Sequence, residues 1–225
     1  MDNNRFYGLV YSSTNECLDA IIQGLRPDYK DRILTAGGSG DQAFAMLWYG
    51  AEVVCVDNDP LQVTYIQERR KLLREGDFSR FVQPTEITTE RSKKYFGNPY
   101  KLKKIREQID NLEVRGPADI IKIAKSEEGF TKVYLSNVLG YTPKCNRYRI
   151  SESIIDALVA MAKNLKQGSL VYLSNHGILC DTYPEFADFI KNTDLFWIDT
   201  ILSNMANKFE KEKASGWDPA VYRVR

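Results

Sequence analysis

The residues best suited to chemistry lie in one stretch, from Arg32 to Asp57. An apolar run ends in small residues at positions 36–41, a helical run follows, and a second apolar run ends at Asp57. Small residues let a ligand approach the backbone, and an acidic residue that ends the next strand can accept hydrogen bonds from ribose hydroxyls. The stretch therefore predicts a nucleoside-binding site.

The glycine cluster also fits a known phosphate-binding pattern. Residues 38–43, Gly-Ser-Gly-Asp-Gln-Ala, match Gly-x-Gly-x-x-Gly/Ala, and Asp57 follows Gly40 by 17 residues, against an expected spacing of about 20. The alternative is a plain tight turn with a solvent-exposed aspartate. The strand expected before the cluster and the helix expected after it favour the nucleoside interpretation.

The charge of Asp41 bears on which nucleoside is bound. A carboxylate at the mouth of the site disfavours the pyrophosphate of NAD and suits the sulfonium and ammonium groups of S-adenosylmethionine. Gly37 and Gly38 tolerate positive φ and leave room for the methionine portion of such a ligand. Capping of the following helix is an equally ordinary role for Asp41. For Tyr7 and Tyr11, a lid that stacks on the cofactor competes with packing of an N-terminal helix.

Polar residues follow two later apolar runs and are candidates for catalysis. Ser136 and Asn137, with Tyr141 close behind, follow the first run, and His176 follows the second. The carboxyl ends of parallel strands face the same cleft. Because His176 is the only histidine, any imidazole general base must be this residue; the alternative is an exposed loop histidine. Asn137 either orients an acceptor or caps a turn.

Strands and helices alternate along most of the chain. Strands are expected near 33–35, 53–57, 112–115, 130–135, 169–174, 196–202 and 220–224, with helices near 14–24, 42–49, 60–76, 120–123, 151–167 and 183–190. This predicts an α/β fold, a doubly wound and mostly parallel seven-stranded sheet of the Rossmann-like, class I methyltransferase-like kind. The last two strands, with no long helix expected between them, predict an antiparallel C-terminal edge, which fits a dehydrogenase with a second domain less well.

The size and composition of the chain set wider bounds. With 225 residues, 43% of them hydrophobic, we expect one domain over 1–225, with an N-terminal helical cap at 1–30 and an inserted helical segment at 78–111. The four cysteines form no Cys-x-x-Cys pair, so no metal site or disulfide is expected. Neither a membrane span nor a signal segment is evident, which predicts a cytoplasmic protein.

A basic and aromatic cluster at 91–106 is the one feature typical of nucleic-acid or anionic headgroup binding. The same composition also describes a solvated helix face. The net charge of +1 argues against a nucleic-acid partner.

Four segments of the chain resemble a known family, and they are residues 11–16 (YSSTNE), 36–43 (AGGSGDQA), 56–62 (VDNDPLQ) and 135–139 (LSNVL). They are similar to corresponding segments of the S-adenosylmethionine:diacylglycerol 3-amino-3-carboxypropyltransferase family, which starts betaine-lipid synthesis. The resemblance covers residues 7–73 well and 130–176 loosely. This chain is much shorter than that family and has Gln42 and Asp59 where asparagine is common.

The resemblance implies S-adenosylmethionine as the cofactor and assigns residues to it. Gly37, Gly38, Asp41 and Gln42 would line the methionine end, Asp57 the ribose, and Asn58 the adenine. The other candidate cofactor-binding residues are Tyr11, Ser39 and Ser136.

The expected function is an S-adenosylmethionine-dependent transferase that moves a methyl or a 3-amino-3-carboxypropyl group to a small-molecule or lipid-like acceptor. Such a reaction needs alignment and exclusion of water more than acid–base groups, in keeping with a chain that has one histidine. The candidate catalytic residues are Asn137, Tyr141 and His176. An NAD-dependent oxidoreductase, or a module that binds S-adenosylmethionine or nucleic acid without turnover, remains an alternative.

Overall fold

The computed structural model describes residues 9–82, 94–140, 152–212 and 216–225. Outside these ranges lie Tyr7, Tyr141, Cys145 and residues 91–93 of the basic cluster. The chain divides into two compact units, one within Met1–Leu18 and Pro27–Ile120 and the other within Asp19–Arg26 and Ile121–Arg225. No helix in the described part is long and apolar enough to cross a membrane.

Seven strands form a mixed sheet, in the order β3-β2-β1 within the first unit and β4-β5-β7-β6 within the second. The strands are β1 (Arg32–Ala36), β2 (Glu52–Val56), β3 (Leu112–Arg115), β4 (Lys132–Tyr134), β5 (Leu170–Leu173), β6 (Phe196–Ile198) and β7 (Ala220–Val224). Within the first unit β1, β2 and β3 pair in parallel; within the second, β4 and β5 are parallel, whereas β7 is antiparallel to both β5 and β6. The predicted α/β sheet with an antiparallel C-terminal edge is confirmed.

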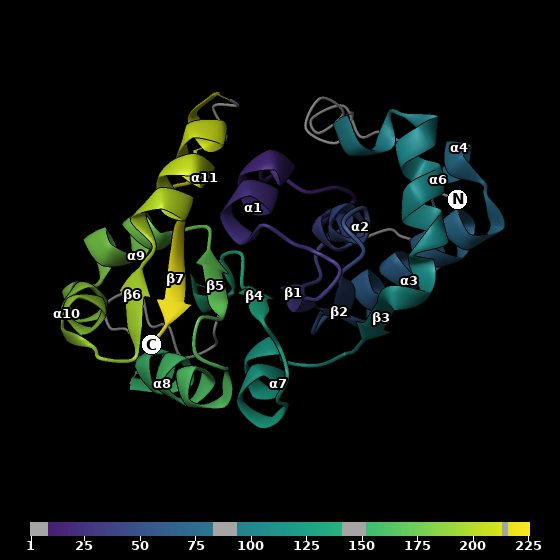
Figure 1. Ribbon diagram of the computed structural model, residues 1–225. Coiled ribbons are helices and arrows are strands. Elements are labelled where there is room, and N and C mark those ends of the chain that lie inside the picture. Colours follow the sequence, from purple (N-terminus) through teal and green to yellow (C-terminus); the bar gives the residue numbers. More distant parts are fainter. Residues whose placement is uncertain (1–8, 83–93, 141–151, 213–215) are drawn as a thin grey trace. The chain divides into compact units, whose positions relative to one another are not determined.

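The first unit contains two consecutive strand–helix repeats and a group of shorter helices (Figure 1). Its helices are α2 (Asp41–Leu47), α3 (Pro60–Glu75), α4 (Phe78–Phe81), α6 (Pro99–Glu107) and the 3₁₀ helix η1 (Ile109–Asn111). Asp59 caps α3 by accepting a hydrogen bond from the Leu61 amide (2.8 Å), and Gly76 ends it at φ 82°. Ile33, Leu34 and Val53–Cys55 are fully buried, as expected of parallel strands covered on both faces.

The segment expected as a peripheral insertion contributes to the core of this unit. Phe81, Tyr95 and Phe96 are each 2% exposed, and the rings of Phe44 and Phe81 pack edge to face with centroids 5.0 Å apart. α3 contacts both α4 and α6. The polar composition that suggested a surface segment belongs to the outer face of α6, where Tyr100 and Lys103 are exposed.

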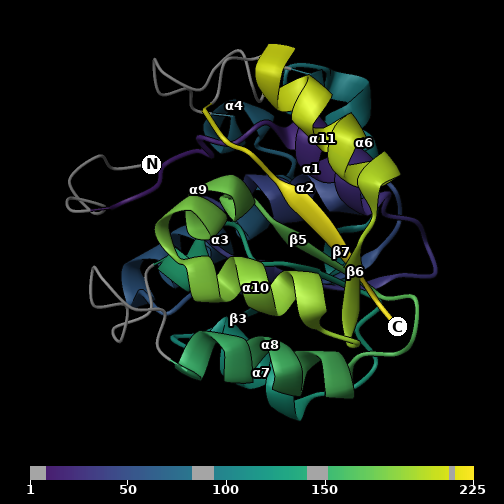
Figure 2. The same ribbon diagram turned by 90° about the vertical axis from the view of Figure 1, so that its left-hand side faces the viewer.

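The second unit carries helices around β4, β5, β7 and β6 (Figure 2). These are α7 (Ile120–Ser126), η2 (Val138–Gly140), α8 (Glu152–Asn164), α9 (His176–Thr182), α10 (Pro184–Asn192) and α11 (Thr200–Glu212), with most of α1 (Leu18–Leu25). α9 and α10 lie side by side, and α11 packs against β7. Gly168, at φ 84°, turns the chain into β5.

The prediction of two late strands without a long helix between them is wrong. The run expected as a strand over 196–202 ends at Ile198, and the 13-residue helix α11 connects β6 to β7. Asp199 starts this helix, because its Oδ1 accepts a hydrogen bond from the Leu202 amide (3.1 Å). Leu202, Ala206 and Glu210 are buried at a spacing of four residues, which is a helical period.

Asp199 also accepts hydrogen bonds from the Arg223 side chain on β7, at 2.6 Å from Nη2 and 3.2 Å from Nε. Burial raises the pKa of Asp199. The hydrogen bonds from Arg223 and from the Leu202 amide lower it by more, so the pKa lies below its usual value. The carboxylate therefore stabilises the fold above the usual pKa, and this contribution is lost as pH falls through the lowered pKa.

We expect Asp199→Ala to lower the free energy of unfolding by about 1–3 kcal/mol at pH 7, through loss of the cap and of the Arg223 contact. Asp199→Asn keeps the capping oxygen and loses the charge, so its loss is smaller and shrinks as pH falls from about 4 through the lowered pKa of Asp199. Urea unfolding of the three proteins at several pH values measures this. Equal stability of wild type and Asp199→Ala at pH 7 would contradict the assignment.

Candidate functional site

The glycine-rich loop after β1 is shaped by close contacts and by positive φ. Gly38 and Gly40 have φ of 48° and 81°, and the Gly40 amide donates to the Gly37 carbonyl (2.8 Å). A Cβ on Gly37 would stand 2.8 Å from both Cβ and Oδ2 of Asp57. Glycine is therefore required at this position, because the loop backbone lies directly against the end of β2.

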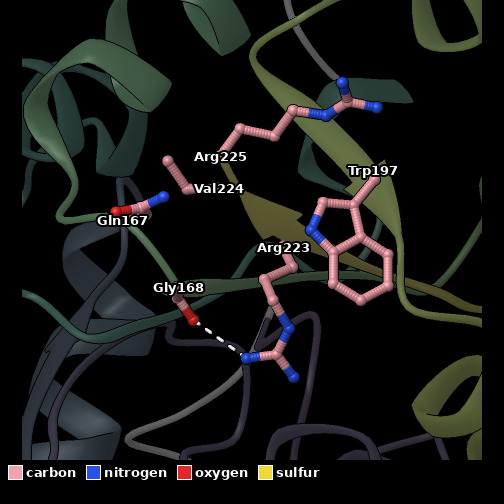
Figure 3. A pocket seen from close by; sticks show the side chains of 6 residues that line it. All are labelled: Gln167, Gly168, Trp197, Arg223, Val224 and Arg225. Carbon is pink, nitrogen blue, oxygen red and sulfur yellow. Dashed lines mark hydrogen bonds between the residues drawn. The ribbon is translucent and has the colours of Figure 1, made fainter.

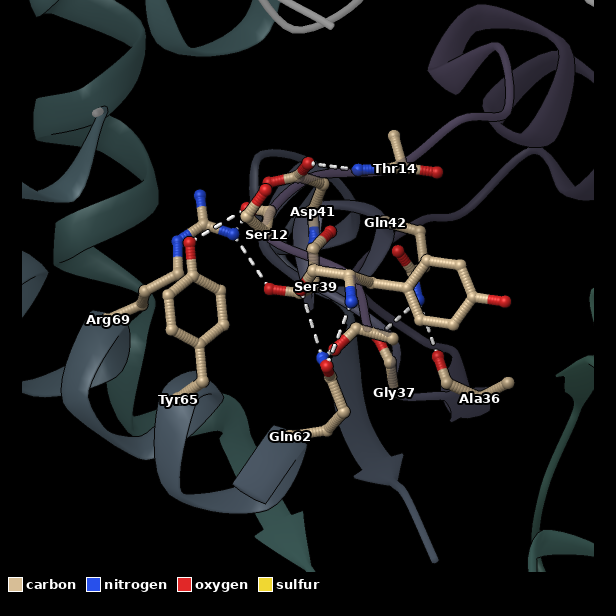
Figure 4. Close-up of polar contacts among 12 residues, drawn as sticks. Ser12, Thr14, Ala36, Gly37, Ser39, Asp41, Gln42, Gln62, Tyr65 and Arg69 are labelled. Atoms are coloured by element: carbon tan, nitrogen blue, oxygen red, sulfur yellow. Dashed lines mark hydrogen bonds and ion pairs between the residues drawn. The ribbon is translucent and has the colours of Figure 1, made fainter. Parts of the chain in front are cut away.

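Gln42 holds the glycine-rich loop through its side-chain amide (Figure 4). Its side-chain amide nitrogen donates to the carbonyl oxygens of Ala36 and Gly37, the latter at 2.8 Å, and only 5% of the residue is exposed. The resemblance placed Gln42 at the methionine end of a cofactor. In the structure its amide group holds the shape of the loop.

Asp57 stands at the carboxyl end of β2 beside the loop. Its Oδ2 accepts a hydrogen bond from the Gly38 amide (2.8 Å) and its Oδ1 accepts one from the Asp59 amide (2.9 Å). Burial and the neighbouring Asp59 charge raise its pKa, whereas these backbone hydrogen bonds oppose the rise. Each carboxylate oxygen has a second lone pair, so the group can still accept hydrogen bonds from a diol. Asn58, the predicted adenine contact, is exposed next to it.

Asp41 does not lie at the mouth of the loop, where the sequence interpretation placed its charge. It is 1% exposed and forms an ion pair with Arg69 of α3, with 2.7 Å between Oδ1 and Nη1. Its Oδ2 accepts a hydrogen bond from the Thr14 amide (2.8 Å). The same Arg69 nitrogen donates to the Ser39 carbonyl (2.7 Å), so loop, helix and N-terminal chain meet at this pair.

Four aromatic rings surround the Arg69 guanidinium. Its central carbon lies 4.6 Å from the ring centroid of Phe81, 5.1 Å from Phe44, 5.7 Å from Tyr65 and 5.9 Å from Phe96. Such cation–π contacts are strongest where water is excluded, and Arg69 is 4% exposed. The inserted segment is thus tied to the glycine loop through one side chain.

Residues 10–14, here called the N-terminal strap, are held next to the glycine loop by two side chains of α3. Gln62 accepts hydrogen bonds from the Val10 and Tyr11 amides (3.0 and 2.9 Å) and donates to the carbonyls of Tyr11 and Gly38. The Tyr65 hydroxyl donates to the Ser12 carbonyl (2.7 Å). A Cβ on Gly38 would lie 4.0 Å from the Tyr11 ring, so this predicted cofactor residue does neighbour the loop.

The remaining predicted residues belong to the second unit. Ser136, at φ 54°, follows β4, and its carbonyl accepts a hydrogen bond from the Ser174 amide (2.9 Å) at the end of β5. This contact places Asn137 and His176 after adjacent strand ends, as expected. His176 is not in a loop but is the first residue of α9. The preceding Asn175 is 6% exposed, and its Oδ1 has no hydrogen-bond partner in the described part of the chain.

The sequence interpretation missed the structural roles of Gln62, Tyr65 and Arg69. A signal was present, because Gln62, Ile66, Arg69 and Leu73 recur at helical spacing and all are buried. Two large polar residues on the buried face of a helix require partners. Their partners lie 24 to 52 residues away in the chain, which a local pattern does not identify.

An open depression near β6 and β7 involves none of the predicted residues (Figure 3). It is lined by Gln167, Gly168, Trp197, Arg223, Val224 and Arg225. The Arg223 guanidinium is already engaged, since it donates to Asp199 and to the Gly168 carbonyl (3.1 Å) and lies 5.6 Å from the Trp197 ring centroid. We therefore treat the depression as part of the structural framework.

No protein-family model matches the chain, and no curated protein matches it in sequence. Among solved structures, a candidate methyltransferase from Streptococcus mutans in complex with SAH is 13% identical, with a TM-score of 0.51 over 95% of this chain and 100% of that one. A methyltransferase from Geobacter sulfurreducens is 14% identical, with a TM-score of 0.50 over 92% and 78%. WbdD, bound to a kinase inhibitor, is 14% identical, with a TM-score of 0.51 over 92% of this chain; the chain spans only 40% of WbdD. The fold is thus the Rossmann-like fold seen in these three structures, two of which are described as methyltransferases or candidate methyltransferases.

Substitution of Arg69 by Met leaves the Asp41 carboxylate buried without its countercharge. We expect a loss of about 3–5 kcal/mol in the free energy of unfolding, and a smaller loss in the double variant Asp41→Asn/Arg69→Met, which removes both charges. A double-mutant cycle by urea unfolding measures the coupling. Strictly additive effects of the two substitutions would contradict a direct energetic pair.

Substitution of Gln62 by Ala removes three hydrogen bonds to the N-terminal strap. We expect the amide hydrogens of Val10 and Tyr11 to exchange with solvent at least about tenfold faster, because each lost bond weakens docking by about 1 kcal/mol. Hydrogen exchange followed by mass spectrometry measures this. Gln67→Ala, an exposed position on the same helix, is the matched control and leaves exchange unchanged. Equal exchange rates in both variants would refute the role of Gln62 in holding the N-terminal strap.

Proposed function

We propose that the chain is an S-adenosylmethionine-dependent methyltransferase whose cofactor lies against the glycine-rich loop after β1. The observation that carries this proposal is the contact between Gly38 and Asp57. The loop amide and the carboxylate are 2.8 Å apart at the ends of neighbouring parallel strands. Ligands of doubly wound sheets bind beyond these strand ends, and an acidic residue at the second strand accepts hydrogen bonds from ribose hydroxyls.

The geometry around α2 favours this cofactor over a dinucleotide. In a dinucleotide site the pyrophosphate sits at the N-terminus of the helix after the glycine loop. Here the Asp41 carboxylate occupies the first turn of α2 and accepts a hydrogen bond from Thr14. A second anionic group at this position would meet a carboxylate and the N-terminal strap. Asp41 disfavours a pyrophosphate here by filling the position, since its charge is neutralised by Arg69.

S-adenosylmethionine supplies an electrophilic methyl carbon next to a positive sulfur. In the transfer, the lone pair of the acceptor forms the new bond to carbon, and the electrons of the carbon–sulfur bond return to sulfur. The protein contributes alignment and exclusion of water. The structures of similar fold include a candidate methyltransferase in complex with SAH, the product of methyl transfer, and this supports methyl over 3-amino-3-carboxypropyl transfer.

The acceptor is proposed to contact residues after β4 and β5. Asn137 and His176 follow these adjacent strands, and Asn175 presents a buried oxygen without a partner among the described residues. Tyr141, which lies outside the described residues, remains a predicted member of this group. A small-molecule or lipid-like acceptor remains the expectation.

The product of the reaction tests the proposal directly. Protein is incubated with S-adenosylmethionine and a cell extract, and the products are analysed by mass spectrometry, with heat-treated protein as the control. We expect S-adenosylhomocysteine. Methylthioadenosine instead would assign 3-amino-3-carboxypropyl transfer. Absence of both, together with stronger thermal stabilisation by NAD than by S-adenosylhomocysteine, would assign an oxidoreductase.

Substitution of Asp57 by Ala tests the cofactor position. We expect the affinity for S-adenosylhomocysteine to fall by about 1–3 kcal/mol, because the ribose hydroxyls lose their acceptor. Isothermal titration calorimetry measures the affinity, and circular dichroism checks that the fold is intact. Asp110→Ala, which removes an exposed carboxylate paired with Arg74 at the surface, is the control and retains wild-type affinity. Unchanged affinity in Asp57→Ala would contradict the assignment.

A further inference from the structure

His176 is held by residues from three elements of the second unit. The Tyr222 side chain comes from β7, the Phe186 ring from α10 and the Cys180 sulfur from α9. The Asp218 carboxylate, just before β7, is the charged group that acts on the imidazole. Cys180 Sγ is 3.6 Å from Nδ1 and 3.7 Å from Nε2, so it does not distinguish the two ring nitrogens.

Tyr222 does distinguish them. Its hydroxyl is 2.5 Å from His176 Nδ1, and this is the one hydrogen bond that the hydroxyl makes within the described residues. The residue is 2% exposed, and burial raises its pKa well above the usual value, so the hydroxyl keeps its proton at neutral pH. A buried hydroxyl with a single partner must donate to that partner to satisfy its hydrogen.

We propose that Tyr222 is a positioning residue that fixes His176 in the tautomer with hydrogen on Nε2, so that His176 donates a hydrogen bond to the acceptor substrate. The opposite tautomer would leave the buried Tyr222 hydrogen without an acceptor. Since Nε2 then has no lone pair for a proton, His176 is not the general base considered from the sequence. The part of this inference that concerns the acceptor rests on the proposed function.

The protonation state of His176 agrees with this arrangement. Burial lowers the pKa of His176, while the Asp218 charge opposes the change and leaves it lowered overall. The imidazole is therefore neutral at pH 7, with Nδ1 as acceptor and Nε2–H as donor. The acceptor substrate would present an oxygen or nitrogen lone pair to this donor. The attacking atom uses its own lone pair for the new bond to carbon, and its proton passes to solvent when the product leaves.

Because the chain has one histidine, its tautomer can be read without assignment. Long-range ¹H–¹⁵N correlation spectra of protein labelled with ¹⁵N-histidine, recorded across pH, distinguish the two tautomers and give the pKa. We expect hydrogen on Nε2 in the neutral form and a pKa below 6.5. Hydrogen on Nδ1 would overturn the proposal. The measurement needs neither cofactor nor acceptor, so it is separate from the test of methyl transfer.

Two variants refine this test. Tyr222→Phe keeps the ring and removes the hydroxyl, and we expect a mixture of tautomers with a pKa closer to 6.5. Cys180→Ala is the matched control, and its tautomer stays that of the wild type. If the tautomer and the pKa of His176 were unchanged in Tyr222→Phe, the positioning role of Tyr222 would be refuted. This conclusion does not depend on whether the variant is active.

Once the product is known, His176→Gln and His176→Ala separate a donor from a base. Glutamine offers an amide N–H but cannot take up a proton at neutral pH. We expect kcat of His176→Gln to stay within about tenfold of wild type and to exceed that of His176→Ala by at least about tenfold. Equal loss of kcat in the two variants would contradict the donor role.

Discussion

The buried ion pair between Asp41 and Arg69 is the interaction on which the candidate cofactor site depends. Both side chains are at most 5% exposed, and they are 2.7 Å apart. A buried charge that loses its partner is strongly destabilising, so each of the two residues requires the other. This pair connects four parts of the first unit. They are the first turn of α2, the Ser39 carbonyl, the Thr14 amide and the aromatic cluster of the inserted segment.

This arrangement explains why a short, glycine-rich loop can hold one conformation. Glycines permit the positive φ angles and the close approach to Asp57, but they also leave the chain freer in the unfolded state. Hydrogen bonds from the side chains of Gln42 and Gln62 to loop carbonyls restrict that freedom. A preformed loop binds a ligand at lower entropic cost, and the Asp57 carboxylate beside it is the proposed hydrogen-bond acceptor for ribose.

The sequence predicted what local patterns determine. The strand, glycine turn and helix that lead to Asp57 follow from alternating apolar runs, and the Asp59 cap and Gly76 stop of α3 lie where residue types require them. The sequence-based predictions were wrong where the interaction partner of a residue lies far away in the chain. Asp41 was expected at the mouth because its countercharge, Arg69, lies 28 residues further on. α11 was missed because Asp199, which caps it, directly follows strand residues. A helix after β5 was expected only from Tyr183, because two residues separate the first residue of α9, His176, from the end of β5.

The proposed position of the cofactor, against the loop beside Asp57, can be tested by locating the bound ligand. Hydrogen exchange of the protein with and without saturating S-adenosylhomocysteine gives that location peptide by peptide. We expect slower exchange in residues 36–42 and 57–62 and in the N-terminal strap, with no such change on addition of NAD. Protection confined to other segments, or protection of these segments by NAD alone, would contradict it.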